Sequence, residues 1–376
     1  MNKIAIVTTG HPPFDDRIYW KFAKSLSINN SVAVFCSTLE IDTISSNIKI
    51  LGFNSNLNNS INKHKKLFDY LLEFEPDIII CSEISAIISA YRFKLNRKNK
   101  CKIISDITEW YPENIVSKLS GFTKIFKYLL IYTANIVLTN LTNALIIGEQ
   151  GKKSRYQIIA PFKKKVIIGY YPILEYFKYK EKKIELDNFN LGYAGVINFK
   201  RGILTLLDVF VDIQIKYPLK DIKLIIAGKF DNLEEERAFL RRIKDEKLSN
   251  IEFLEWTDYN NISDHLSKMD VCFDLRELTF IYNNSLPIKF FEYLASGKPV
   301  IYSAVKPLKK LGVDKFGFLV NPTNKEQIIS VVEKYMTDKE LYMKHSKNAR
   351  EYIEKGNNWE EESKKLINFI NFFCIK

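Results

Sequence analysis

Apolar runs of strand length alternate with amphipathic helical segments through most of this chain, and the alternation occurs twice. The first series opens with a predicted strand at 3–9 and a predicted helix at 16–27, and it continues through apolar runs at 31–37, 76–83 and 102–107. Parallel strands need a crossover connection, most often a helix, and the helices then cover both faces of the sheet. The pattern therefore predicts an α/β fold.

The alternation lapses in a charged, aperiodic stretch at 171–190 and then restarts. A length of 376 residues is ample for two domains. We therefore predict an amino-terminal domain at 1–170, a linker at 171–190, a second domain at 191–358 and a closing amphipathic helix at 359–376. Both domains are expected to be open Rossmann-like sheets that face each other across a cleft. Ligands of such sheets bind beyond the carboxyl ends of the strands.

Composition indicates a globular protein of a reducing compartment. Hydrophobic residues make up 46% and aromatic residues 13% of the chain. The five cysteines include no Cys-x-x-Cys pair, and the four histidines show no metal-ligand spacing, so we expect a cytoplasmic protein without a metal site. No secretory signal is expected. The uncharged stretch 128–148 is interrupted by Asn and Thr, which disfavours a membrane span.

The positive charge is concentrated in the first half of the chain. Residues 1–170 contain 23 Lys and Arg against 13 Asp and Glu, whereas the remainder is almost balanced at 33 against 31. A basic half indicates an anionic partner, and nucleic acid, anionic lipid headgroups and a phosphate-bearing substrate all qualify. The alternative is that dispersed lysines only keep the surface soluble.

The segment NNSLPIKFFEYLASGKPVIYSA, residues 283–304, is typical of a helix followed by a buried strand. Ser285 is the predicted N-cap, Pro287 falls in the first turn, and Gly297 suits the end of the helix. The free N–H groups of such a helix suit a diphosphate. Glu292, two turns further on, can accept hydrogen bonds from hydroxyl groups. The alternative is an ordinary amphipathic helix with a surface Glu–Lys pair.

Several segments resemble one enzyme family, the retaining GT-B-type "group 1" glycosyltransferases of the glycogen-synthase-like superfamily (family four). The resemblance is carried by SLPIKFFEYLASGKPVI, GYAGVINFKRG, IKLIIAGK, GFLVNP and WEEESKKL. HPPFDDRIYWKFAKSL resembles the amino-terminal signature of a bacterial branch that acts on surface polysaccharides. The resemblance spans nearly the whole chain in the right order. It implies an acceptor-binding amino-terminal domain and a nucleotide-sugar-binding second domain.

The resemblance also implies roles in donor binding. Backbone amides around Ser285 and Leu286 would hold the donor diphosphate, and Glu292 would bind the ribose hydroxyls. The full set of implied donor-binding residues is Gly10, Gly195, Lys200, Arg201, Asn284, Ser285, Leu286, Lys289 and Glu292.

The sequence departs from the family pattern at three positions. Asn284 stands where the family often has Glu, Val196 where it often has Arg, and Arg201 where it often has Lys. Arg201 can still bind phosphate in bidentate fashion, and Lys200 or Lys289 is expected to supply the second charge.

In the amino-terminal half the candidate residues follow strands. His11 comes after the first strand, where its imidazole can bond a sugar hydroxyl or a phosphate. The predicted catalytic set is His11, Asp16, Glu109 and Arg201, and the predicted acceptor-binding set is Arg17, Asp106 and Glu109. At least one residue of Asp15, Asp16 and Arg17 is expected to be only a cap or an ion-pair partner, and a helix cap is the alternative for Asp106 and Glu109.

Together these observations predict a retaining glycosyltransferase that moves a sugar from a nucleoside diphosphate to a glycan or lipid-linked acceptor in surface polysaccharide biosynthesis. No Asp-x-Asp pair occurs in the chain, so we expect metal-independent catalysis without a cofactor. The alternatives are a nucleotide-sugar epimerase or phosphorylase on the same fold and, more remotely, a basic nucleic-acid-binding module, although no nucleic-acid motif occurs.

An anionic membrane surface is a further candidate partner, which would make the protein peripheral on the inner face of the cytoplasmic membrane. Lys118, Lys124 and Lys127 lie beside apolar residues such as Phe122 and Phe126. A helix there can place apolar side chains at the headgroup boundary with basic ones around them. The alternative is that these apolar residues belong to the core.

Overall fold

The computed structural model describes residues 1–55, 60–98, 100–117, 119–179, 181 and 188–374. The chain forms two compact units. The amino-terminal unit comprises Met1–Tyr170 and Glu361–Lys376, and the carboxy-terminal unit comprises Tyr171–Glu360. The described residues of the predicted linker thus fall in the carboxy-terminal unit, and residues 180 and 182–187 of that linker lie outside the described part. Lys118, too, lies outside the described residues.

The described part of the amino-terminal unit contains an eight-stranded sheet in the order β3-β4-β2-β1-β5-β6-β7-β8. All neighbours are parallel except β3 and β4. The strands are β1 (Lys3–Thr8), β2 (Ser31–Cys36), β3 (Ile41–Ser45), β4 (Ile48–Gly52), β5 (Ile78–Cys81), β6 (Lys102–Ile107), β7 (Ala144–Ile147) and β8 (Lys164–Ile167).

The helices of this unit differ from the predictions at two places. The predicted helix at 16–27 is a π-helical segment (Asp16–Ala23) that continues into α1 (Lys24–Ser27), with Asp15 as its N-cap. In the uncharged stretch 128–148 the sequence pattern predicts a helix that ends at about Val137, whereas the helix runs to Leu141, and its Asn135 and Thr139 find partners inside the unit. The other helices are α2 (Ser60–Phe74), α3 (Ala86–Asn96), α4 (Glu113–Val116), α5 (Gly121–Leu141), α6 (Gln150–Ile159) and α14 (Trp359–Cys374), of which α14 lies in this unit from Glu361 on.

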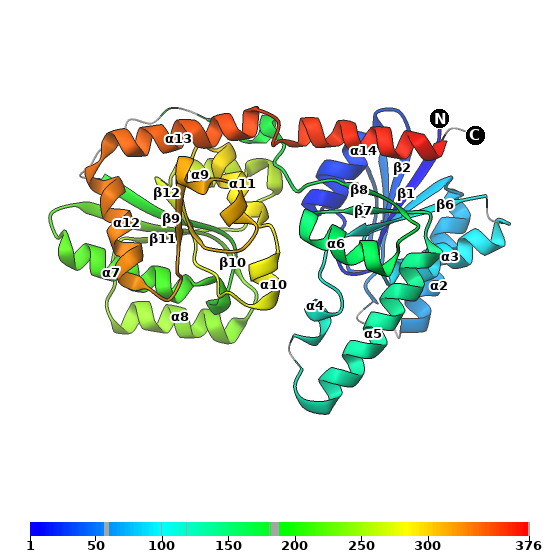
Figure 1. Ribbon diagram of the computed structural model, residues 1–376, viewed down its shortest axis with the longest axis horizontal. Coiled ribbons are helices and arrows are strands. Elements are labelled where there is room, and N and C mark those ends of the chain that lie inside the picture. The colour runs from blue at the N-terminus through cyan, green and yellow to red at the C-terminus, as the bar shows by residue number, and fades with distance from the viewer. Residues whose placement is uncertain (56–59, 99, 118, 180, 182–187, 375–376) are drawn as a thin grey trace. The chain divides into compact units, whose positions relative to one another are not determined.

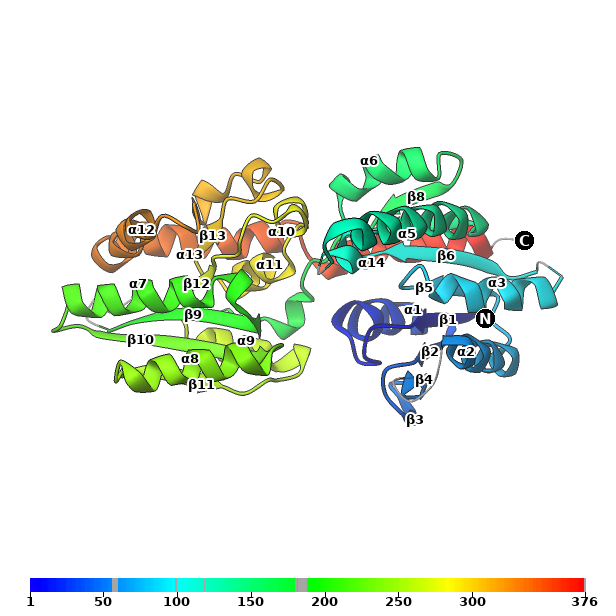
Figure 2. The same cartoon turned by 90° about the horizontal axis from the view of Figure 1, so that it is seen from below.

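The carboxy-terminal unit has an all-parallel sheet in the order β11-β10-β9-β12-β13-β14. Its strands are β9 (Asn188–Ile197), β10 (Asp221–Phe230), β11 (Ile251–Leu254), β12 (Val271–Asp274), β13 (Val300–Ser303) and β14 (Gly317–Val320). Its helices are α7 (Ile203–Lys216), α8 (Leu233–Asp245), α9 (Ile262–Ser267), α10 (Phe280–Asn284), α11 (Ile288–Ala295), α12 (Lys325–Thr337) and α13 (Lys339–Glu354) (Figures 1 and 2).

Apolar cores cover both faces of this second sheet. Buried side chains of α7, α8 and α12 pack on one face, together with residues such as Leu191 and Ile226 of the strands. Buried side chains of α9, α11 and α13 pack on the other face, around Phe290 and Tyr302. The inner strands β12 and β13 are therefore buried along their length, as expected for a parallel sheet covered on both sides.

Both sheets reverse their strand order beside their first strand. In the amino-terminal unit the reversal lies between β1 and β5, and in the carboxy-terminal unit it lies between β9 and β12. Successive connections leave such a point in opposite directions, so the carboxyl ends of the two strands open a crevice that binds ligands. The candidate site residues are therefore to be sought after β1, β5, β9 and β12. Among the described residues no helix is long and apolar enough to cross a membrane.

Candidate functional site

The carboxy-terminal unit holds a cluster of basic side chains at the ends of β9 and β12. Arg201 follows β9, Arg276 follows β12, and Lys289 lies on α11. Burial lowers the pKa of Lys289 well below its usual value, and the charges of Arg201 and Arg276 lower it further, although Asp274 opposes them. Since Asp274 is already paired with Arg276, the cluster as a whole carries excess positive charge. Such a cluster suits a polyanion.

Arg276 is held rigidly by a carboxylate that is fully buried. Its Nε lies 2.7 Å from Asp274 Oδ1, and its Nη2 donates to Asp274 Oδ2 and, over 2.8 Å, to the hydroxyl of Tyr302. Burial would raise the pKa of Asp274, but the charge of Arg276 and its hydrogen bonds outweigh burial and lower that pKa. Sequence reasoning missed Asp274 and Arg276. The available signal was a charged pair at the end of a buried strand, in DVCFDLR at 270–276.

Arg201 has donor capacity to spare. It ends a short 3₁₀ turn (Phe199–Arg201) whose N-cap, Asn198, accepts a hydrogen bond from the Arg201 amide over 2.9 Å. The buried Nε of Arg201 has no hydrogen-bond partner among the described residues. A buried donor without an acceptor is costly, and the oxygens of a bound anion would satisfy it.

Gly195 makes room for Lys289. Its φ is +121°, and a Cβ at this position would lie 1.8 Å from Lys289 Nζ. The ammonium group lies 3.2 Å from the hydroxyl of Tyr193. The sequence-predicted residues Gly195, Arg201 and Lys289 therefore lie together, whereas Lys200 is exposed at the surface.

The start of α11 corrects one prediction. Helix α11 begins at Ile288 with Pro287 as the N-cap, so the prediction of Ser285 as N-cap is wrong. A separate short helix, α10, precedes it, and Ser285 ends that helix by donating to the carbonyl of Ile281 over 2.8 Å. Asn284 likewise donates to the carbonyl of Phe280. The first-turn amides of α11 remain as candidate anion donors, and Glu292 lies half-buried on that helix.

In the amino-terminal unit, a buried glutamate organises the loop after β1. Glu83, two residues beyond β5, accepts hydrogen bonds from Thr8 Oγ1 (2.7 Å), the amide of Thr9 (2.8 Å) and the amide of Gly10 (3.1 Å). His11 Nε2 lies 3.5 Å from the same carboxylate. Sequence reasoning missed Glu83, although it ends the predicted apolar run PDIIICSE at 76–83.

His11 is partly exposed and surrounded by acidic groups. Burial by itself would lower the pKa of His11, but the hydrogen bond and charge of Asp15, with the charges of Glu83 and Glu109, raise that pKa to about 9. The distance from His11 Nδ1 to Asp15 Oδ2 is 3.3 Å. His11 therefore carries a positive charge at neutral pH, next to the loop that ends β1. The predicted residues His11, Glu109 and Gly10 thus lie in one neighbourhood.

Two residues predicted to bind the acceptor bind each other instead. Arg17 and Asp106 are both buried, and two charge-assisted hydrogen bonds of 2.6 and 2.7 Å join them. The guanidinium also packs against the rings of Phe22 and Tyr170. The pair is therefore not available to a ligand in this structure. Asp16 forms an ion pair with buried Lys21 over 3.0 Å. This agrees with the prediction that at least one residue of this segment is only a cap or an ion-pair partner.

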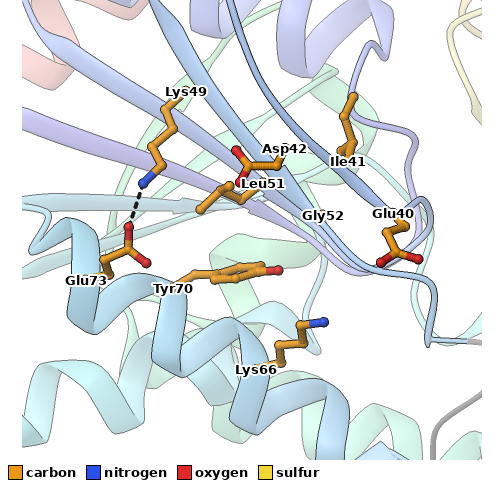
Figure 3. Close-up of a pocket in the computed structure, with 9 residues that line it drawn as sticks. All are labelled: Glu40, Ile41, Asp42, Lys49, Leu51, Gly52, Lys66, Tyr70 and Glu73. Atoms are coloured by element: carbon orange, nitrogen blue, oxygen red, sulfur yellow. Dashed lines mark hydrogen bonds and ion pairs between the residues drawn. The ribbon is translucent and has the colours of Figure 1, made fainter.

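A cavity of about 480 Å³ lies elsewhere in the amino-terminal unit, against the edge strands β3 and β4 and helix α2. Figure 3 shows Tyr70 and Lys66 reaching into it from α2, opposite Asp42, with the ion pair of Lys49 and Glu73 (2.6 Å) at one side. No sequence prediction fell on this cavity. It lies away from the reversal of strand order, so we do not assign the donor or acceptor to it.

Comparison with known proteins gives one family match, in the carboxy-terminal unit. The family model described as glycosyl transferases group 1 matches residues 177–352, all within the carboxy-terminal unit. Among curated proteins no relative matches.

Among solved structures, the chain is similar to a sucrose-phosphate synthase from Thermosynechococcus elongatus (TM-score 0.77, 15% identity, 100% of each chain covered). It is also similar to Anabaena HepE in complex with UDP and glucose (TM-score 0.74, 12% identity, 99% of this chain and 100% of that chain). WaaG, a glycosyltransferase involved in lipopolysaccharide biosynthesis, matches as well (TM-score 0.69, 13% identity, 96% and 98% covered). The predicted α/β fold with two Rossmann-like domains of GT-B type is confirmed.

Proposed function

We propose that this chain, a GT-B glycosyltransferase of group 1 by its family match and its fold, moves a sugar from a nucleoside diphosphate to a glycan or lipid-linked acceptor with retention of configuration. The observation that carries the proposal is the cluster of Arg201, Arg276 and Lys289 at the reversal of strand order in the carboxy-terminal unit. A diphosphate carries negative charge and hydrogen-bond acceptor oxygens, which complement the positive charge and the unpaired donor of this cluster. The UDP bound to the structurally similar HepE supports this class of donor.

In this proposal the leaving group is stabilised by positive charge held in place before the reaction. Negative charge on the diphosphate rises as the bond to the sugar breaks, so cations aimed at it bind the transition state better than the substrate. Arg201 offers its unpaired Nε. Arg276 is fixed by Asp274, so its charge needs little reorganisation. The first turn of α11 adds backbone donors, and Glu292 on that helix binds the ribose hydroxyls.

The proposed acceptor is a sugar hydroxyl of a glycan or lipid-linked intermediate in surface polysaccharide biosynthesis, and the amino-terminal unit binds it. Its charged His11, with Glu83 and Glu109 nearby, supplies a donor to an acceptor phosphate or hydroxyl. The sequence signature at 11–26 and the likeness to WaaG, with its role in lipopolysaccharide biosynthesis, support this pathway class. The enzyme would then work in the cytoplasm, at the inner face of the cytoplasmic membrane.

Arg201 provides the first test. A panel of nucleotide sugars is screened by thermal shift, and the stabilising donor is then used in assays with wild type, Arg201→Ala and Arg201→Lys. We expect Arg201→Ala to lower kcat more than it raises KM, because the charge acts on the transition state. Arg201→Lys should recover part of kcat. Arg237→Ala, at an exposed arginine on α8 of the same unit, is the matched control.

Two results would contradict the proposal. If no nucleotide sugar stabilises the protein or labels a product, the donor assignment fails. If a donor is epimerised or cleaved at full rate without any acceptor, the chain is an epimerase-type enzyme rather than a transferase.

A further inference from the structure

Helix α5 of the amino-terminal unit presents a continuous apolar stripe to solvent. Phe122 is 81% exposed, Phe126 61% and Leu130 59%, and Ile125 and Leu129 are exposed to a similar degree. These residues recur at intervals of three and four, so they fall on one face of the helix. The stripe continues along the helix to Val137, which is also exposed. Contiguous apolar surface of this kind marks an interaction site.

The exposed stripe is not the face by which α5 packs on its unit, because a different face of the helix makes those contacts. Asn135 and Thr139 are fully buried, with Asn135 Oδ1 accepting from Thr139 Oγ1 (3.1 Å) and from the hydroxyl of Tyr156 (3.1 Å). Tyr132 packs against the neighbouring core. The helix thus turns Asn135 and Thr139 inward, where Asn135 Oδ1 accepts two hydrogen bonds, and it turns large apolar groups outward. Together with α4, its amino-terminal half extends beyond the sheet of the unit (Figure 1).

A second exposed apolar segment adjoins the carboxyl end of α5. Asn140 donates to the carbonyl of Ile159 over 2.9 Å, and Lys163 donates to the carbonyl of Thr142 over 2.7 Å. These bonds place the turn between α6 and β8 beside α5. In or next to that turn, Ile158 is 80% and Phe162 96% exposed. We call the stripe and this turn together the α5 surface.

The α5 surface lies in a segment with almost no negative charge. From Asn114 to Ile167 the sequence has nine Lys and Arg, and Glu149 is its one acidic residue. Glu149 is buried and paired with Lys152 over 2.8 Å. Lys124 and Lys127 are exposed and make no hydrogen bond or ion pair with a described residue. The surface therefore combines exposed aromatic and aliphatic groups with uncompensated positive charge.

We infer that the α5 surface docks the protein on an anionic lipid bilayer, with Phe122, Phe126 and Phe162 entering the headgroup region. Aromatic side chains favour this interface, and basic side chains beside them bind anionic headgroups. A second copy of the chain is a poorer occupant, because it would bring two basic surfaces together. A lipid surface supplies both the apolar phase and the missing negative charge.

Docking on lipid goes beyond glycosyl transfer and is measured without donor or acceptor, so its failure would remove the proposed place at the membrane but leave the proposed transfer reaction untouched. The full chain is sedimented with vesicles of phosphatidylcholine, with or without phosphatidylglycerol. We expect binding to the anionic vesicles only. Binding should weaken as salt rises, because screening shortens the range of the attraction.

Matched variants separate the apolar and the charged contributions. Phe126→Gln combined with Leu130→Gln should weaken vesicle binding roughly tenfold or more, since two large side chains no longer leave water. The control, Ile215→Gln with Leu219→Gln, changes residues of the carboxy-terminal unit that are 74% and 99% exposed, and it should bind as wild type. Lys124→Gln and Lys127→Gln should each cost about fivefold, whereas Lys→Arg at both positions should cost little.

Three outcomes would overturn the inference. The first is that the protein stays in the supernatant with anionic vesicles at low salt. The second is equal binding to neutral vesicles, or equal loss in the Ile215/Leu219 control. The third is that analytical ultracentrifugation shows self-association that Phe126→Gln with Leu130→Gln abolishes while vesicle binding is absent, which would make the surface an interface between copies of the chain.

Discussion

At the scale of single residues, two buried carboxylates each hold a cation at the end of a strand. Asp274 binds Arg276 beyond β12, and Glu83 binds the loop that carries His11 beyond β1. Removing either carboxylate would leave a charge or several backbone donors unpaired, which costs more than the pair itself contributes. The positions of Arg276 and of the loop that carries His11 therefore depend on these two carboxylates.

Glu292→Ala is expected to weaken binding of the donor nucleotide while leaving the fold intact. Loss of a hydrogen bond from a ribose hydroxyl to a charged carboxylate should cost about 1.5–3 kcal/mol. Calorimetric titration with the nucleoside diphosphate measures this loss, and Glu340→Ala, an exposed position on α13, is the control. An affinity equal to that of wild type would mean that Glu292 only covers the surface of α11.

His11 should titrate far above an ordinary histidine. Its pKa is raised from 6.5 to about 9, so its charge stabilises the amino-terminal unit fully below pH 6.5, and that contribution is lost as pH rises through about 9. NMR titration of the imidazole signals, assigned with His11→Asn, measures the midpoint. His64 is an internal control, because burial first and then Lys63 lower its pKa below 6.5. A His11 midpoint near that of a free imidazole would refute this electrostatic picture.

At the scale of elements, the turn between β9 and α7 has little room. Gly202 has a φ of +77°, and a Cβ there would lie 2.1 Å from the backbone oxygen of Leu275, at the end of β12. The backbone of the turn at Gly202 therefore lies closer to the backbone of Leu275 than a side chain at position 202 would permit. This approach sets the position of Arg201, the residue before the glycine.

Gly202→Ala should destabilise the carboxy-terminal unit more than Gly356→Ala does. Both glycines have positive φ, but a Cβ at Gly356 meets no atom within 4 Å. The difference between the two variants thus isolates the clash with Leu275, which should be worth roughly 1–3 kcal/mol. Urea unfolding measures it, and nucleotide titration should show weaker binding for Gly202→Ala only. If the two variants had equal free energies of unfolding, β12 would have to shift to make room for the added Cβ.

At the scale of the whole molecule, both units repeat one plan with different consequences. Each has a largely parallel sheet that reverses its strand order beside its first strand. The carboxy-terminal unit places excess cations at that reversal, whereas the amino-terminal unit places acidic residues around one histidine. The first arrangement suits a diphosphate. The second suits an acceptor substrate that can accept a hydrogen bond from a charged histidine.

Transfer activity is expected to survive chelation of divalent metals. In the proposed mechanism, Arg201, Arg276, Lys289 and the start of α11 supply the positive charge that a metal ion would otherwise bring to the diphosphate. Activity is measured after treatment with EDTA and again after Mg²⁺ is restored. Loss of activity with EDTA and its recovery with Mg²⁺ would show that these groups do not suffice.

The family resemblance drew attention to Arg201 and Lys289, whereas the sequence by itself determined the α/β class, the two series of strands and helices, and the place of Glu292 on a helix. These follow from local rules, because the period of apolar residues and the residues that end helices act within one segment. The start of α11 escaped those rules, since Ser285 fits the end of one helix as well as the start of the next.

Only the tertiary structure decided which charged residues meet. Arg17 and Asp106 are 89 positions apart, Thr8 and Glu83 are 75 apart, and β-strand order alone brings them together. It also decided that Phe122 and Phe126 face outward while Asn135 faces inward. The physical reason is that pairing and burial depend on which strands become neighbours, and that information is spread over the whole chain rather than held in any one segment.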